Sequence, residues 1–276
     1  PQRFHPPRPV RPWPDVLDAT TFGPAAPQVR TPGQVPFEDI SEDCLFLNVY
    51  TPAADDRKRP VLFWIHGGGY LNGSGRVYNG RMFVQSHDVV VVTINYRMGA
   101  LGFMHVGHLD AGLGESVNNG ILDQICALEW TRDNIRSFGG DPDNVLVFGE
   151  SAGGTATAML LGCPRASGLF HKAVVHSPHV DLIPLGKGHE TFTNHCIERL
   201  GGDPAVNGLA TLNNASIEDL IALSQPSADG TGEHQPHLGL RHPDHVSFSP
   251  AIDGSLIPAA IADTIRDHGT VPFLAG

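Results

Sequence analysis

The residues best suited to chemistry surround Ser151, in the pattern Gly-x-Ser-x-Gly from Gly149 to Gly153. Residues 145–148 form an unbroken apolar run, which predicts a strand buried on both faces, and residues 155–161 predict a small apolar helix. A strand, a tight turn and a helix make a nucleophile elbow, in which the turn strains the serine backbone and exposes its hydroxyl. The amide of Ala152 would lie at the helix start, where N–H groups lack partners and can stabilise a developing negative charge.

A second motif strengthens this interpretation, because a chain with 32 glycines in 276 residues can contain the serine pattern by chance. His66 to Gly69 reads His-Gly-Gly-Gly and follows a predicted strand. Consecutive glycines let backbone N–H groups approach an oxyanion, and one such donor is worth about 3 kcal/mol. The alternatives are a hairpin or a phosphate loop, but the Lys-Ser/Thr pair of a phosphate loop is missing. Both motifs at strand ends, in this order, indicate a serine hydrolase.

The elements that must position these motifs alternate between strand and helix. Strands are predicted over 44–50, 61–65, 89–95, 145–148, 172–177 and 271–275, and helices over 120–138, 155–161, 191–200, 216–224 and 258–268. This alternation predicts an α/β fold with a mostly parallel sheet. Asn118 or Asn119 can cap the helix over 120–138, and Gly139-Gly140 would end it.

The first 40 residues are rich in proline, which excludes long helices and central strands. We expect an extended surface wrap pinned by three aromatic residues, Trp13, Phe22 and Phe37. Residues 225–245 contain four histidines among prolines and glycines, in spacings that match no common zinc pattern. A surface loop is therefore favoured over a metal site.

Composition excludes several classes of function. The formal net charge is −11, and the longest basic run is Arg57 to Arg59, so no nucleic-acid-binding face is expected. No apolar run is long enough to span a membrane. The four cysteines are widely spaced, which favours isolated thiols, although one disulfide is possible. The compartment stays open between cytoplasmic and secreted.

Dense local matches show that the chain resembles the type-B carboxylesterases, the family that includes the cholinesterases. The matching segments are SEDCLFLNVYTPA from Ser41, PVLFWIHGGGY from Pro60, VVVVTINYRMGALGF from Val89, NGILDQICALEWTRDNIRSFGGDPDNVLVFGESAGG from Asn119 and GLFHKAV from Gly168; SPAIDGSLIP and VPFLAG are similar further on. The resemblance implies an α/β-hydrolase fold. It implies a single partial catalytic domain over 1–276, with a surface wrap over 1–40, the sheet core over 41–176 and a helical region with a final strand over 177–276.

The resemblance also implies roles for particular residues. Ser151 would be the nucleophile, and the amides of Gly68, Gly69 and Ala152 would form the oxyanion hole. Glu42 and Arg97 match a structural ion pair of the family. The segment that often holds a partner for Cys44 is Ala25-Ala26-Pro27-Gln28 here, so that cysteine would be free. Residues 27–43 contain no Trp, which disfavours a choline substrate.

The catalytic acid and histidine of the family would follow the segment VPFLAG, at positions that these 276 residues do not include. No histidine within the chain has a motif that suggests a substitute. We therefore expect part of an enzyme, with the acid and histidine supplied by a second chain or by a missing segment.

The expected function is that of a serine carboxylic-ester hydrolase that acts through an acyl-enzyme on small-to-medium esters. No metal or organic cofactor is expected. One alternative is a non-catalytic adhesion relative, although such proteins typically lose the nucleophile that Ser151 provides. A second is a lipase of the hormone-sensitive type, which would not carry SEDCLFLNVY.

Overall fold

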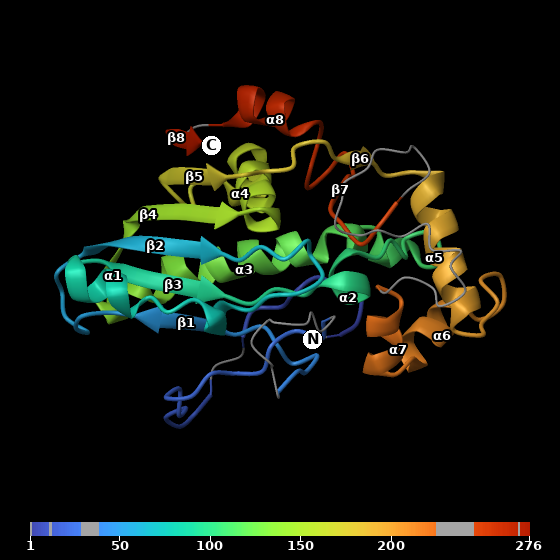
Figure 1. Cartoon of the computed structure of the whole chain (residues 1–276), viewed down its shortest axis with the longest axis horizontal. Coiled ribbons are helices and arrows are strands. Elements are labelled where there is room, and N and C mark those ends of the chain that lie inside the picture. Colours follow the sequence, from blue (N-terminus) through green and yellow to red (C-terminus); the bar gives the residue numbers. More distant parts are fainter. Residues whose placement is uncertain (1, 11–12, 29–38, 225–245, 270) are drawn as a thin grey trace.

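A computed structural model describes residues 2–10, 13–28, 39–224, 246–269 and 271–276. Its centre is a six-stranded sheet in the order β1-β3-β2-β4-β5-β8 (Figure 1). The strands are β1 (Leu47–Tyr50), β2 (Arg59–Ile65), β3 (Val90–Ile94), β4 (Gly140–Glu150), β5 (Lys172–His176) and β8 (Phe273–Ala275). Only the pairing of β1 with β3 is antiparallel, so the mostly parallel sheet is confirmed. A short parallel pair, β6 (Ile183–Pro184) with β7 (Ala251–Ile252), lies apart from it.

The described helices connect these strands. They are α1 (Arg81–Ser86), α2 (Gly99–Phe103), α3 (Asn119–Asn134), α4 (Ala152–Gly162), α5 (Lys187–Arg199), α6 (Gly208–Asn214), α7 (Ile217–Ala222) and α8 (Ile261–His268). Helix α3 continues as a 3₁₀ turn to Phe138 and ends at Gly139, whose φ of 76° is left-handed, as the glycine pair predicted. The side chain of Asn118 does not cap α3. Its amide instead donates to the carbonyl oxygen of Ala251, 3.0 Å away.

The two faces of the sheet are covered unequally. Helices α3 and α4 contact β4, and the side chains that alternate toward this layer, such as Val145 and Val147, are fully buried. Leu146 and Phe148 alternate to the opposite face and are only half-buried. The prediction that residues 145–148 are buried on both faces was therefore wrong, because among the described residues the second face of β4 is not fully covered.

The proline-rich N-terminal segment is anchored by other residues than those predicted. Trp13 and Phe22 are 53% and 49% exposed, so they do not pin the segment, and Phe37 lies outside the described residues. Phe4 is instead fully buried, and Ala25 forms a β-bridge with Ile40. Burial of Phe4 in the core and the bridge at Ala25 therefore anchor this segment.

The remaining predictions concern the cysteines, membrane-spanning helices and metal sites. All four cysteines are free, as expected. Within the described ranges, no helix has the length and apolar character needed to cross a membrane. The same ranges contain no cluster of His, Cys, Asp or Glu side chains that could hold a metal ion. The histidine-rich segment 225–245 lies outside the described residues.

Candidate active site

The strained serine predicted from the elbow motif is present. Ser151 separates the end of β4 from the start of α4, and its backbone has φ 55° and ψ −122°. A non-glycine residue adopts such a conformation only when the surrounding structure enforces it. Here the Ser151 N–H donates to the carbonyl oxygen of His176 at 3.0 Å, and the Ser151 carbonyl accepts from the N–H of Thr155 at 2.8 Å. Neighbouring strand and helix therefore hold the turn from both sides.

The turn is tight because the strand and helix approach each other at glycine. A Cβ atom on Gly153 would collide with the carbonyl oxygen of Ile65 and lie 2.8 Å from that of His66. The first turn of α4 can therefore lie against the end of β2 only without a side chain at this position. This close approach brings the serine motif and the glycine loop together.

The glycine loop follows β2 directly beside the serine. Ile65 and Gly149 are partners in the parallel pairing of β2 with β4, so the two loops leave neighbouring strands at the same edge of the sheet. An ideal Cβ atom on Gly67 would lie 3.3 Å from the Cβ atom of Ser151. The next two residues, Gly68 and Gly69, have φ values of 108° and 62°. Their left-handed conformations turn the chain sharply at the serine.

His66 is part of the support for this loop. It is fully buried, and its ring stacks on that of Tyr96 with centroids 4.4 Å apart. The Tyr96 hydroxyl donates to the His66 carbonyl at 2.9 Å. His66 Nδ1 lies 2.8 Å from the Gly67 carbonyl, and because a carbonyl only accepts, Nδ1 carries the proton. Burial lowers the pKa of His66 to about 4, so the ring is neutral at pH 7.

No general base accompanies the serine among the described residues. The structure records no hydrogen bond to the Ser151 hydroxyl from any side chain in the described ranges. His66 is turned into the loop and the Tyr96 ring, so it is not available as that base. Among the described residues, the elbow and the glycine loop are thus brought together without a histidine side chain that hydrogen-bonds to the serine hydroxyl.

The predicted pair of Glu42 with Arg97 was wrong. Arg97 binds Asp123 through two parallel hydrogen bonds, of 2.8 Å from Nε and 2.7 Å from Nη2. Glu42 binds Arg3 instead, at 2.6 Å. The physical reason is burial: the side chains of Arg97 and Asp123 are 3% and 0% exposed, whereas that of Glu42 is 26% exposed. A buried guanidinium needs the carboxylate that shares its environment.

Sequence reasoning missed Asp123, although a signal was available. Asp123 lies between Leu122 and Gln124 in the buried first half of α3. A carboxylate inside a buried helix segment must find a cation, so Asp123 was a stronger candidate partner than Glu42.

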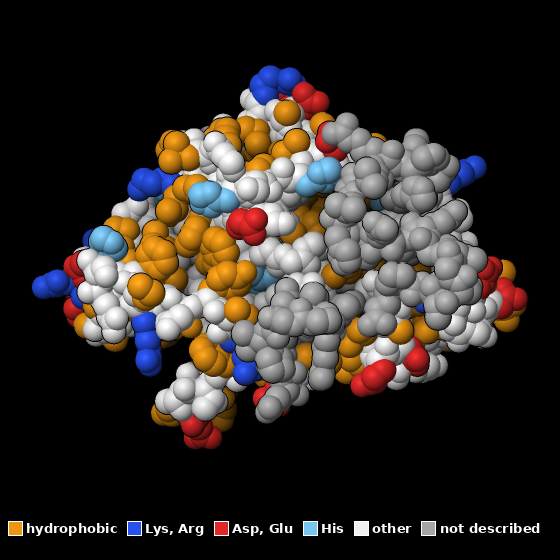
Figure 2. Space-filling view, viewed as in Figure 1, with side chains coloured by type: hydrophobic (Ala, Val, Ile, Leu, Met, Phe, Trp, Pro, Cys, Tyr) orange, Lys and Arg blue, Asp and Glu red, His pale blue; other side chains and the backbone are white. Residues whose placement is uncertain are grey.

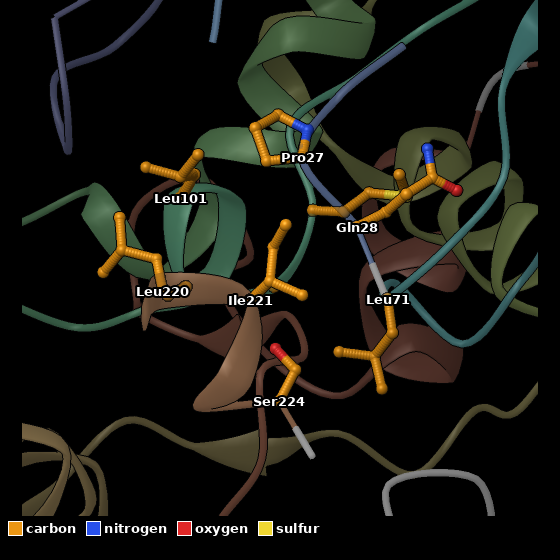
Figure 3. A pocket seen from close by; sticks show the side chains of 10 residues that line it. Pro27, Gln28, Leu71, Leu101, Leu220, Ile221 and Ser224 are labelled. Atoms are coloured by element: carbon orange, nitrogen blue, oxygen red, sulfur yellow. The ribbon is translucent and has the colours of Figure 1, made fainter. Parts of the chain in front are cut away.

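A small apolar pocket adjoins the glycine loop, and the sequence did not reveal it. Figure 3 shows Leu71 of this loop facing Ile221 and Leu220 of α7 across the pocket, with Pro27 and Leu101 along its side. Gln28 and Ser224 also line it, and both directly precede residues outside the described ranges.

Comparisons with known proteins agree with this geometry. The family model described as the carboxylesterase family matches residues 1–276. A para-nitrobenzyl esterase of Bacillus subtilis is 46% identical, over 99% of this chain and 55% of its own length. A medium-chain fatty acyl-CoA hydrolase precursor of Anas platyrhynchos is 43% identical, over 100% of this chain and 49% of its own. The solved carboxylesterase of Geobacillus stearothermophilus superposes with a TM-score of 0.84 at 39% identity, covering 99% of this chain and 54% of that one.

The fold and the two loops are thus those of an α/β-hydrolase. The chain belongs to the carboxylesterase family. It spans about half the length of the curated relatives that it matches.

Proposed function

We propose that the protein carrying these 276 residues hydrolyses carboxylic esters with Ser151 as its nucleophile. The observation that carries the proposal is the strained backbone of Ser151 against the glycine loop. Attack by its hydroxyl on the ester carbonyl forms a tetrahedral intermediate, which collapses to an acyl-enzyme and releases the alcohol. Water then attacks the acyl-enzyme and releases the acid.

The negative oxygen of the intermediate would be held by three backbone amides, those of Gly68, Gly69 and Ala152. The left-handed turns at Gly68 and Gly69 support this role, because they follow Gly67 where it lies against the serine. Ala152 is the first residue of α4, so its N–H has no partner within that helix. Such donors stabilise the transition state more than the substrate.

The catalytic acid and histidine would come from polypeptide outside these 276 residues. Three observations support this part of the proposal. Among the described residues, no histidine side chain hydrogen-bonds to the Ser151 hydroxyl, and the relatives are about twice as long. A third is the half-covered sheet face, where hydrophobic side chains gather over β2 and β4 (Figure 2). Further polypeptide packed there would bury that face.

The substrates would be small-to-medium acyl or aryl esters. The names of the relatives, a para-nitrobenzyl esterase and a medium-chain fatty acyl-CoA hydrolase precursor, support this class.

Labelling with a fluorophosphonate tests the proposal. We expect the complete protein to be labelled at Ser151 and to hydrolyse p-nitrophenyl butyrate, and the Ser151→Ala variant to lose labelling and about 10⁶-fold in turnover. The 276-residue chain alone should label far more slowly, because a serine without a base is a weak nucleophile. Hydrolysis that survives Ser151→Ala would refute the assignment.

A further inference from the structure

Gln28 joins the N-terminal segment to the glycine loop through a two-way contact. The N–H of Gly73 donates to Gln28 Oε1 at 2.9 Å, and Gln28 Nε2 donates to the Gly73 carbonyl at 3.0 Å. Nε2 also donates to the Ala26 carbonyl at 3.0 Å. The side chain is 4% exposed, so these bonds face little competition from water. One side-chain amide thus pairs with both backbone groups of a single glycine.

Gly73 lies where the glycine loop closes. Within the loop, the N–H groups of Leu71 and Asn72 donate to the Gly68 carbonyl at 3.0 and 3.1 Å, which folds residues 68–72 into one compact turn. The chain leaves this turn through Gly73, whose φ is +124°. A Cβ atom on Gly73 would collide with His66 Nδ1 and lie 2.8 Å from the Gly67 carbonyl. The two ends of the loop therefore pack directly against each other.

Gln28 binds the backbone of Gly73, at the end of the loop, from outside the loop. Figure 3 shows its amide group pointing away from Leu220 and Ile221. The pocket wall is thus formed by the backbone and stem of Gln28, while its amide group is engaged with Gly73. Loss of the amide would remove two bonds from the loop without removing a group that faces the serine.

We infer that Gln28 is a positioning residue for the oxyanion hole: by pairing with Gly73 it fixes the amides of Gly68 and Gly69 toward Ser151. The inference rests on the proposed function, because it presumes that these amides hold the oxyanion. Displacement of such donors weakens transition-state stabilisation more than substrate binding, so the effect falls on kcat.

The test uses the Gln28→Met variant of the complete protein, since Met keeps the length of the side chain and removes both bonds to Gly73. Gln124→Met is the matched control, because Gln124 is likewise a buried glutamine and its amide has no hydrogen-bond partner among the described residues. With p-nitrophenyl butyrate we expect Gln28→Met to lower kcat by about 10- to 100-fold, with KM changed by less than about threefold. Affinity for a trifluoromethyl ketone, which mimics the tetrahedral intermediate, should fall in parallel. The control should retain its kcat.

Hydrogen exchange of residues 66–74 provides a readout that does not depend on catalysis. Gln28→Met should increase exchange at Gly73, whose N–H loses its acceptor, and Gln124→Met should not. If Gln28→Met does not fold, Gln28→Glu replaces it, since Glu keeps an acceptor for the Gly73 N–H and loses the donor. An unchanged kcat together with unchanged exchange would overturn the inference. A wild-type protein that neither labels nor hydrolyses esters would instead refute the proposed function, and exchange would still decide whether Gln28 holds the loop.

Discussion

At the scale of single residues, burial decides which charges pair. Arg97 offers its guanidinium to Asp123 in a bidentate arrangement, and its backbone N–H adds a third bond of 3.0 Å to the same carboxylate. Arg97 also donates to the carbonyl of His5 at 2.7 Å, which ties the N-terminal segment to the core. The pair thus connects α3, the segment after β3 and the chain start.

Removal of one partner should therefore cost far more here than at the surface. We expect Asp123→Asn to lower the free energy of unfolding by about 3–5 kcal/mol, because Arg97 would be buried without a counter-charge. Glu42→Gln should cost only about 1 kcal/mol, because the pair of Glu42 with Arg3 is partly exposed. Urea unfolding of both variants measures the difference. Equal losses would contradict the importance assigned to burial.

The sequence could predict site residues whose role depends on local backbone geometry, but not those whose partner depends on tertiary packing. Ser151 and the glycines around it were predictable because their backbone geometry depends on residue type. The strained backbone expected of Ser151 is present, with φ 55°. The partner of Arg97 was not predicted correctly, because partner choice depends on which helix packs beside it. The roles of Ser151, Gly68, Gly69 and Ala152 in catalysis stay predictions.

At the scale of elements, the site depends on α4 lying against the end of β2. Gly153 is the point of closest approach, where the helix start meets the carbonyl oxygens of Ile65 and His66. These carbonyls belong to the backbone that leads into the glycine loop, so any shift of α4 moves the serine and the loop relative to each other.

Gly153→Ala should separate these elements. The added methyl group would collide with backbone atoms, and we expect a loss of about 3 kcal/mol in the free energy of unfolding, with slower fluorophosphonate labelling of Ser151. Gly186→Ala is the control, because a Cβ atom there meets nothing within 4 Å and its φ of −177° is open to any residue. Thermal melts and labelling rates measure both effects. A fully stable Gly153→Ala variant with wild-type labelling would show that the close approach is not required.

Elements were predictable where a strong local pattern existed. The β-branched run 89–95 correctly predicted β3, and the apolar periodicity after Asn119 correctly predicted α3. Helices α1, α2 and α6 were missed because each has seven residues or fewer, which is too short for a clear apolar periodicity.

At the scale of the whole molecule, one face of the sheet carries apolar side chains that the described part of the chain does not fully cover. Leu62 and Trp64 of β2 and Phe148 of β4 are half-buried there. Leu274 of β8 pairs with Val174 in register, so it faces the same side, and it is 71% exposed. Because soluble monomers rarely expose large contiguous apolar patches, this face supports the proposal that further polypeptide of the protein packs on it.

Leu274→Lys distinguishes a covered face from a bare one. If further polypeptide buries Leu274, the variant of the complete protein should lose about 2 kcal/mol or more, since an apolar contact is lost and a charge is buried. The same change in the 276-residue chain should stay within about 0.5 kcal/mol, because the side chain is exposed there.

Val206→Lys is the control: Val206 is 80% exposed and lies outside the sheet, so both proteins should tolerate it. Urea unfolding of the four variants measures these effects, and an equally small effect of Leu274→Lys in both proteins would mean that this face stays open in the complete protein.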